Sequence, residues 1–214
     1  MNMEESPVYI GEAYLNRVKL ALIGLDYLDG DMKAESAELL SIEPFNRPLY
    51  ELLYAAIVTG VEDYLRTRLK HDVLKSEERM RLYLNRYNYY YRKKRERQIR
   101  FSKDEPLTPD IQERLLETLD NHVYHRIDII NGYFEAVASV KLPEDDLWQK
   151  LFAIIQTRHI IIHEGGKRPN GKRIELTPYD VHQALNVAEH FVLQAERLFY
   201  QKGNEYLYDI PGEE

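Results

Sequence analysis

The sequence predicts an all-α protein, built as an up-and-down helical bundle of five to six main helices. Apolar residues recur at about every 3.6 positions along most of the chain, and no segment keeps the strict alternation of a half-buried strand. Helix-starting and helix-ending residues stand at the boundaries of these apolar stripes. A chain of 214 residues suffices for one substantial core, so we expect a single domain over residues 1–214.

The first third of the chain predicts two long helices and a short one. Residues 9–28 carry an apolar stripe at helical spacing, and an Asp-Gly-Asp turn follows them. Residues 33–40 could form a short helix. A second long helix is expected over residues 48–69, because apolar residues again recur every three or four positions there.

The middle of the chain predicts a basic helical segment over about residues 76–103. Its helix is expected over residues 76–97, and a loop should follow. Thr108 and Pro109 form an N-cap and first-turn pair, so the next helix should begin there. That helix is expected to continue to residue 140, with a kink near Asn121.

The last third predicts two more helices. Acidic residues after Pro143 favour a helix start, which predicts a helix over residues 145–164. Residues 167–176 hold a proline, a glycine and four basic residues, as expected of a loop or small hairpin. A Thr-Pro cap begins the final helix, over residues 177–202, and an acidic tail follows over residues 203–214.

Composition narrows the class of protein. A net charge of −7 and a pI near 5.6 argue against a general nucleic-acid coat protein, which is usually basic, but leave room for a local basic groove. The chain has no cysteine, so it has no disulfide or thiolate site. With no signal-peptide pattern and no membrane-spanning run, we expect a cytoplasmic protein without a membrane partner.

The segment from Arg158 to Gly166 is the main candidate for chemistry. Arg158, His159 and His163 interrupt an apolar helical run, and burying such groups unpaired is costly. Histidine transfers protons near neutral pH, and arginine can hold a phosphate with two hydrogen bonds. Because RNA supplies its own 2′-hydroxyl nucleophile, this pair suits RNA cleavage without a metal or cofactor.

The spacing of the pair also predicts a homodimer. Arg158 and His163 are five residues apart, so on an ideal helix they diverge by about 140°. A long arginine side chain, a distorted last turn or a second subunit could bring them together. We expect a two-fold dimer that places both motifs at a shared cleft.

Two other interpretations of the same residues stay open. Arg158 could pair with a buried acid such as Glu62 or Asp63, while His163 caps the helix C-terminus. Alternatively, His159 and His163 lie on one helical face and could bind zinc. A third ligand would have to come from elsewhere, and the chain has no HExxH motif, so we expect no metal site.

Arg158 and His163, near the end of a late helix with one further helix downstream, resemble the RX4–6H motif of the HEPN superfamily. Active HEPN members are helical, metal-independent endoribonucleases, so the resemblance implies that Arg158 and His163 are the catalytic pair. An earlier helix resembles the family's acidic helix. The site-supporting residues that the resemblance implies are His159, Glu62, Asp63 and Glu164.

The resemblance implies a biological setting as well. It indicates a toxin or an anti-phage defence effector, with an antitoxin or a defence-system protein as a possible partner. Family members paired with a nucleotidyltransferase antitoxin often carry a tyrosine two residues after the histidine. This chain has Gly165 there, so the resemblance does not extend to control by modification of that tyrosine.

A second candidate site is the basic, tyrosine-rich stretch. Seven cations stand against one acid over residues 92–103, directly after a run of tyrosines. Cations can follow phosphates, and tyrosines can stack on unpaired bases. The predicted RNA-binding residues are Arg92, Lys93, Lys94, Arg95, Arg97, Lys167 and Arg168. The stretch could instead be a solvated helix whose tyrosines pack inward, or a docking surface for an acidic partner.

These observations lead to one main hypothesis and one alternative. The main hypothesis is a homodimeric, metal-independent endoribonuclease of HEPN type that cleaves RNA through attack by the 2′-hydroxyl. The alternative is a non-catalytic HEPN-like module that binds RNA or a protein partner.

Overall fold

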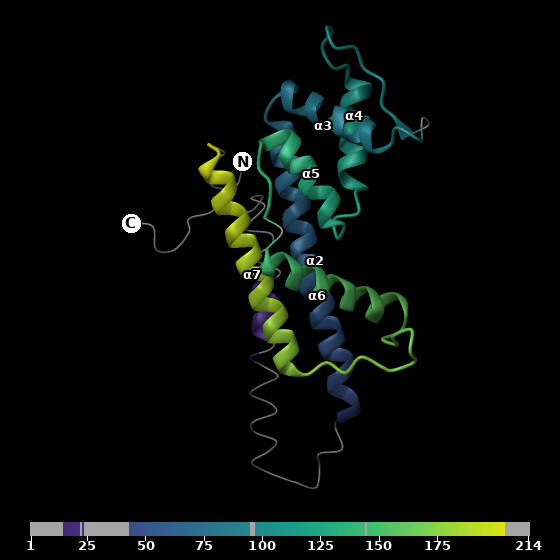
Figure 1. Ribbon diagram of the computed structural model, residues 1–214, viewed down its shortest axis with the longest axis vertical. Coiled ribbons are helices and arrows are strands. Elements are labelled where there is room, and N and C mark those ends of the chain that lie inside the picture. Colours follow the sequence, from purple (N-terminus) through teal and green to yellow (C-terminus); the bar gives the residue numbers. More distant parts are fainter. Residues whose placement is uncertain (1–14, 22, 24–42, 95–96, 144, 204–214) are drawn as a thin grey trace. The chain divides into compact units, whose positions relative to one another are not determined.

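The computed structural model describes residues 15–21, 23, 43–94, 97–143 and 145–203 (Figure 1). Over these residues the chain is helical and contains no β-strand, apart from one isolated bridge between Lys167 and Arg173. The predicted all-α fold is therefore confirmed. The expected short helix at residues 33–40 and the acidic tail at 204–214 lie outside the described residues.

Six helices account for most of the described chain. They are α2 (Glu43–Leu74), α3 (Glu77–Tyr90), α4 (Pro109–Asp120), α5 (Ile127–Ala138), α6 (Asp146–His163) and α7 (Pro178–Gln201). Residues 15–21 are helical too, inside the first predicted helix. In the part of the chain that can be described, no helix combines the length and the apolar character needed to cross a lipid bilayer.

Four helix boundaries differ from the prediction. α2 begins before Pro48, which sits in its second turn and removes one backbone hydrogen bond without ending the helix. At its other end, burial of Asp72 and Val73 carries α2 past residue 69. The predicted kink near Asn121 is a complete break between α4 and α5, and α3 ends at Tyr90, before its run of cations.

The described chain divides into two compact units. Among the described residues, the first unit holds 62–94, 97–143 and 194–203, and the second holds 15–21, 23, 43–61 and 145–193. α2 and α7 each contribute residues to both units. The expectation of one domain over residues 1–214 stays a prediction.

Each unit has its own apolar core. In the first unit Phe134 of α5 meets Phe199 of α7 edge to face, with ring centroids 5.0 Å apart. In the second unit Trp148 of α6 lies near Phe191 of α7, with centroids 6.4 Å apart. Leu151 in the middle of α6 is fully buried. Removing these side chains from water is the main stabilising contribution to each unit.

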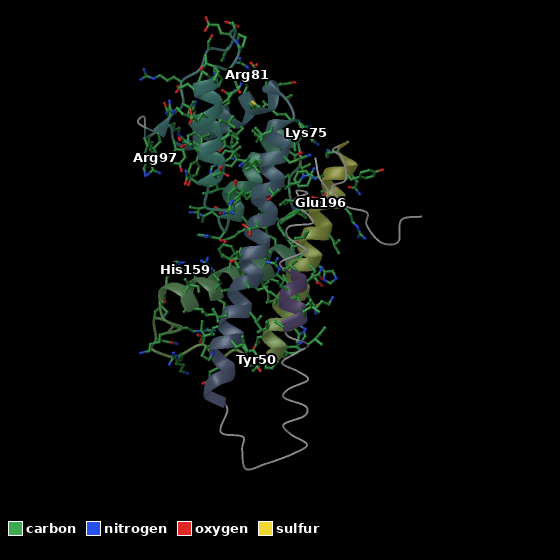
Figure 2. All side chains as sticks on the ribbon, turned by 180° about the vertical axis from the view of Figure 1, so that it is seen from behind. Tyr50, Lys75, Arg81, Arg97, His159 and Glu196 are labelled. Atoms are coloured by element: carbon green, nitrogen blue, oxygen red, sulfur yellow. The ribbon has the colours of Figure 1, made fainter. Side chains whose placement is uncertain are left out.

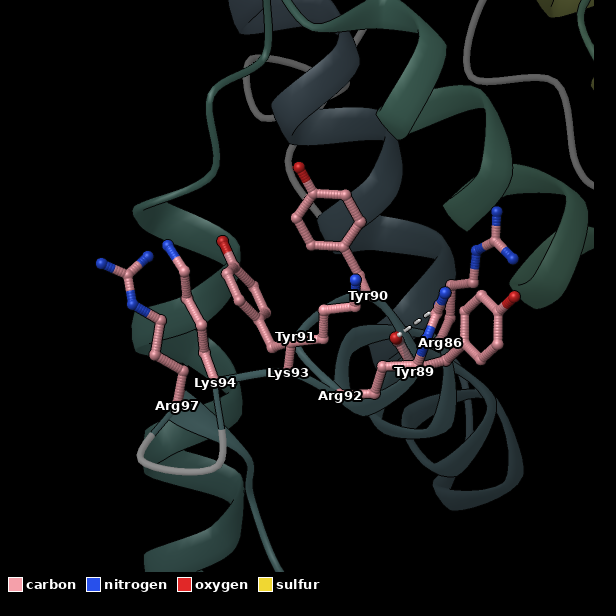
Figure 3. Close-up of a pocket in the computed structure, with 8 residues that line it drawn as sticks. All are labelled: Arg86, Tyr89, Tyr90, Tyr91, Arg92, Lys93, Lys94 and Arg97. Atoms are coloured by element: carbon pink, nitrogen blue, oxygen red, sulfur yellow. Dashed lines mark hydrogen bonds between the residues drawn. The ribbon is translucent and has the colours of Figure 1, made fainter.

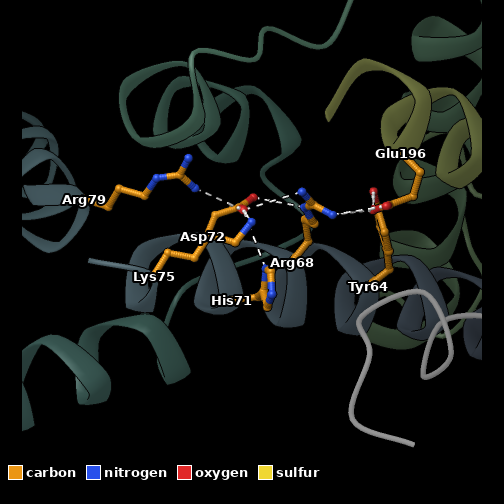
Figure 4. Close-up of polar contacts among 7 residues, drawn as sticks. All are labelled: Tyr64, Arg68, His71, Asp72, Lys75, Arg79 and Glu196. Atoms are coloured by element: carbon orange, nitrogen blue, oxygen red, sulfur yellow. Dashed lines mark hydrogen bonds and ion pairs between the residues drawn. The ribbon is translucent and has the colours of Figure 1, made fainter. Parts of the chain in front are cut away.

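A buried ionic network joins α2 to α7 within the first unit (Figure 4). Arg68 is fully buried, and its Nη1 donates to both carboxylate oxygens of Glu196, at 3.2 and 3.1 Å. Its Nε donates to Asp72 Oδ2 at 3.0 Å. The Tyr64 hydroxyl donates to Glu196 Oε1 at 2.9 Å. Each buried charge is thus paired and hydrogen-bonded, as burial requires.

Further cations surround the carboxylate of Asp72. Arg79 Nη1 and Lys75 Nζ lie 3.4 and 3.5 Å from its Oδ1, and His71 Nδ1 lies 3.6 Å away. Burial alone would raise the pKa of Asp72, but the neighbouring imidazole and the charges of Arg68 and Lys75 together lower it. Asp72 therefore stays ionised at neutral pH and links the end of α2 to α3.

Candidate functional site

The Arg-x4-His motif lies in the second unit, at the C-terminal end of α6. The Asp145 side chain caps the start of this helix by accepting from the Trp148 N–H at 3.0 Å. At the other end, Gly165 and Gly166 have φ values of 61° and 72°, which only glycine adopts at little cost. The Gly166 N–H donates back to the Ile160 carbonyl at 3.0 Å. These two glycines end the helix directly after His163.

Arg158 is half-buried and has no ion pair with the described residues of the second unit. Its Nε is enclosed without a hydrogen-bond partner among the described residues. A guanidinium in this state can accept an anionic ligand, because no acid among the described residues occupies its donors.

His159 and His163 are exposed and face each other on α6 (His159 is labelled in Figure 2). Their ring centroids are 4.7 Å apart and the rings are tilted by 46°. Glu164 follows as the exposed C-cap residue, and its N–H donates to the Ile160 carbonyl. Within the described ranges, no cluster of three or more metal-ligating side chains is present.

Glu62 and Asp63 belong to the first unit and have partners within it. Glu62 Oε1 is hydrogen-bonded to His125 Nδ1 at 3.0 Å. Asp63 Oδ1 accepts from Arg66 Nη1 at 2.7 Å. The site-supporting role of the two acids stays a prediction, and His125 is a partner that the sequence analysis did not identify.

Residues 167–173 form a small hairpin, inside the stretch 167–176 for which the sequence predicts a loop or a small hairpin. Lys167 and Arg173 make the isolated bridge, and the Arg168 N–H donates to the Lys172 carbonyl at 2.9 Å. Gly171, at a φ of 77°, forms the tight turn. The hairpin follows directly on the end of α6, so its cations lie next to the motif in the chain.

Arg168 lines a groove of about 400 Å³ in the second unit. Lys150, Thr157 and Asp180 line it too, and Tyr54 hydrogen-bonds to Thr157 there. Burial raises the pKa of the Tyr54 hydroxyl to about 12, so it stays a neutral hydrogen-bonding group. The sequence analysis missed this groove, because its residues come from four separate segments.

One face of α6 carries exposed apolar residues beside the histidines. Phe152 is 42% exposed and Ile162 is 48% exposed. His159 and His163 are exposed on the same stretch of helix. These exposed apolar side chains are available to a contact with another protein chain.

The second candidate site is a pocket of about 560 Å³ in the first unit, at the end of α3 (Figure 3). We call it the tyrosine–cation pocket. Its lining residues are Arg86, Tyr89, Tyr90, Tyr91, Arg92, Lys93, Lys94 and Arg97. Figure 3 draws Tyr90 between one group that holds Tyr91, Lys94 and Arg97 and another that holds Arg86 and Tyr89.

Local structure explains why these residues gather. α3 ends at Tyr90, and the cations that follow lie at the negative end of the helix dipole, which favours them. The Asn88 side chain then holds the returning chain. Its Nδ2 donates to the Ile99 carbonyl at 2.8 Å, and its Oδ1 accepts from the Ile99 N–H at 2.9 Å. Since Ile99 is buried, the loop from Tyr91 to Gln98 is closed at its base.

Four of the predicted RNA-binding residues line this pocket, namely Arg92, Lys93, Lys94 and Arg97. Arg95 lies outside the described residues. Arg86 was not predicted, although its place four residues before Tyr90 on a helix puts both on one face. Lys167 and Arg168 belong to the second unit and its hairpin.

The tyrosines of α3 divide between the core and the pocket. Tyr83 and Tyr87 are buried, so the predicted inward packing is correct for them. The Tyr83 hydroxyl is hydrogen-bonded to His122 Nε2 at 2.7 Å. Burial lowers the pKa of His122 to about 4, so its imidazole is neutral at neutral pH. Tyr89 and Tyr90, by contrast, are 58% and 47% exposed.

Comparison with known proteins gives no relative. Neither a family model, nor a curated protein, nor a solved structure matches this chain. Function therefore has to be argued from the residues and their geometry.

Proposed function

We propose that this protein is a metal-independent endoribonuclease of HEPN type, with Arg158 and His163 as its catalytic pair. The observation that carries the proposal is the end of α6, where one helix holds a half-buried guanidinium without an acid partner among the described residues and two exposed imidazoles. Such groups are what phosphate binding and proton transfer require.

The reaction needs a base, an acid and a phosphate-binding group. A histidine takes the proton from the 2′-hydroxyl, and that oxygen attacks the adjacent phosphorus. The bond from phosphorus to the 5′-oxygen breaks, and the leaving oxygen receives a proton from a protonated imidazole. Arg158 binds the non-bridging oxygens and offsets the charge that grows on them. The products are a 2′,3′-cyclic phosphate and a 5′-hydroxyl.

A homodimer would bring the Arg158 of one copy and the His163 of the other to a shared cleft. Arg158 and His163 diverge on the helix, and one His163 cannot act as base and acid in the same step. The exposed Phe152 and Ile162 beside the histidines support a contact between two copies of α6. Light scattering should give the mass of a dimer at micromolar concentration. A strict monomer would count against a shared site.

The experiment that tests the reaction is analysis of product ends. RNA products should end in a 2′,3′-cyclic phosphate, and a single 2′-deoxy nucleotide at the cut site should block cleavage there. Cleavage that survives the 2′-deoxy substitution would exclude the proposed nucleophile. We also propose a toxin or anti-phage role in the cytoplasm, with an antitoxin or defence partner. This part of the proposal is based only on the resemblance of Arg158 and His163 to the HEPN motif.

The alternative function is RNA binding without cleavage. The tyrosine–cation pocket favours it, because this pocket offers cations and aromatic faces but no proton-transfer pair. Unchanged RNA in the presence of stoichiometric protein, together with specific binding, would favour this alternative over the endoribonuclease.

A further inference from the structure

We propose that the tyrosine–cation pocket is a binding site for unpaired RNA, separate from the motif on α6. Its tyrosine rings would stack on bases, and its cations would hold the adjoining phosphates. The binding itself does not depend on catalysis. Its role in capturing substrate for cleavage rests on the proposed function.

The charge of the pocket favours a polyanion. The lining residues that the structure describes comprise five cations and three tyrosines, with no carboxylate. The whole chain carries a net charge of −7, so this concentration of cations is local. Binding a phosphate chain would relieve the repulsion among these cations and release counterions from the RNA.

The aromatic faces favour bases over an acidic peptide. Tyr89 and Tyr90 are 58% and 47% exposed, so much of their apolar ring surface is in contact with water. Binding an acidic peptide through charge would not require these exposed rings, whereas stacking on a base would. Arg92 lies over the Tyr89 ring at 4.5 Å from its centroid. The Arg92 Nη1 donates to the Tyr89 carbonyl at 3.4 Å, and the remaining donors of the guanidinium edge can bind phosphate, while the Tyr90 ring remains available to a base.

Shape favours a single strand over a duplex. In double-stranded RNA the bases are already stacked and paired, so their faces cannot reach a tyrosine ring. A pocket of about 560 Å³ lined by three tyrosines can take a flat ring that has been freed from a helix. Single-stranded sites commonly combine such stacking platforms with a basic track.

The pocket is also held in shape before any ligand arrives. The two hydrogen bonds between Asn88 and Ile99 close the base of the loop. Arg86 packs against Gly132 of α5, where an added Cβ would collide with its guanidinium. A site organised in advance loses less conformational entropy on binding, which favours affinity.

The experiment measures binding of a fluorescent, unstructured RNA of 12 nucleotides to the His163→Ala protein, so that cleavage does not interfere. Tyr90→Leu keeps most of the side-chain volume but removes the stacking face. We expect Kd to rise roughly tenfold, with the same slope of log Kd against log salt. Arg92→Glu with Lys93→Glu should raise Kd and flatten that slope. Tyr179→Leu, at a 69% exposed tyrosine of the second unit, is the matched control and should leave Kd unchanged.

Three results would overturn the inference. They are equal affinity for a duplex of the same length, unchanged Kd in the Tyr90 and Arg92/Lys93 variants, and competition by a polyglutamate of equal charge as strong as that by RNA. The last would reassign the pocket to an acidic protein partner. Failure of cleavage with intact binding would instead remove the endoribonuclease proposal and leave the pocket assignment standing.

Discussion

At the scale of single residues, the buried Arg68 and the half-buried Arg158 differ in what surrounds them. Arg68 meets Glu196 and Asp72 inside the first unit. Arg158 has no carboxylate partner in the described part of its own unit. An arginine with a structural role is expected to pair with a carboxylate, and an arginine that binds a ligand is expected to lack such a partner. Substituting the two arginines should therefore change the free energy of unfolding by different amounts.

Arg68→Met should lower the free energy of unfolding by about 3–5 kcal/mol, because it removes the buried guanidinium that pairs with the carboxylates of Glu196 and Asp72. Arg158→Met should change it by less than about 1 kcal/mol, since the described residues form no ion pair with Arg158 that the substitution would break. Urea unfolding of both variants measures the difference. Equal losses would mean that Arg158 is held by a structural partner and is not reserved for phosphate.

His122 gives the fold a dependence on pH. Its pKa is lowered by burial to about 4, from an ordinary value of 6.5, so between these values the unfolded chain binds the proton more readily. The free energy of unfolding should therefore fall as pH falls through this window, and below pH 4 this group contributes no further loss. Between pH 7 and pH 5 the contribution is roughly 2 kcal/mol.

The control is His122→Gln, which keeps a polar group near the Tyr83 hydroxyl but does not titrate. Urea unfolding at pH 7 and pH 5 should show a smaller loss on acidification in this variant than in the parent. Parallel losses in the two proteins would show that His122 is not the group responsible.

At the scale of elements, the sequence predicted which segments are helical better than where they end. Thr108, Asp145 and the glycine pair after His163 are local signals, and helices begin or end at each of them. The extension of α2 to Leu74 depends on the burial of Asp72 against Arg68 and Arg79. The sequence around Asp72 does not predict these ion pairs, because side-chain pairing depends on the tertiary fold.

The candidate sites, too, could be predicted from sequence only where the signal is local. The cations after Tyr90 were predicted, because charge density is visible in sequence. The clamp of Asn88 on Ile99 and the pairing of Glu62 with His125 were not predicted, because they join residues 11 and 63 positions apart. Sequence indicates which residues carry chemistry, whereas the fold decides which of them meet.

The end of α6 yields a test at this scale. Gly165 has a φ of 61° with open space around its Cα, so Gly165→Ala adds strain of about 1 kcal/mol and no clash. Relief of that strain would shift the last turn and His163 with it, so kcat should fall roughly tenfold. Gly203→Ala, at a φ of 72° beyond α7, carries equal strain far along the chain and should leave kcat unchanged. Equal kcat values in the two variants would mean that the position of His163 does not control turnover.

At the scale of the whole molecule, the chain is a helical protein with two compact units and one candidate site in each. The first unit holds the tyrosine–cation pocket, and the second holds the Arg158 and His163 motif. The sequence predicted the helical class but not the division into units, since α2 and α7 run through both without a composition change or linker. RNA binding and RNA cleavage would then be separate properties, and substitutions in one site should remove one property without removing the other.

Cleavage of RNA without metal tests the central claim most directly. Pure protein should cut a mixed RNA substrate in excess EDTA, and His163→Ala should abolish turnover while leaving RNA binding within about twofold, because the imidazole moves protons and need not add ground-state affinity. Arg158→Ala should weaken both binding and turnover. Parent-like cleavage by both single variants, or activity that disappears with EDTA and returns with added metal, would contradict the assignment of Arg158 and His163.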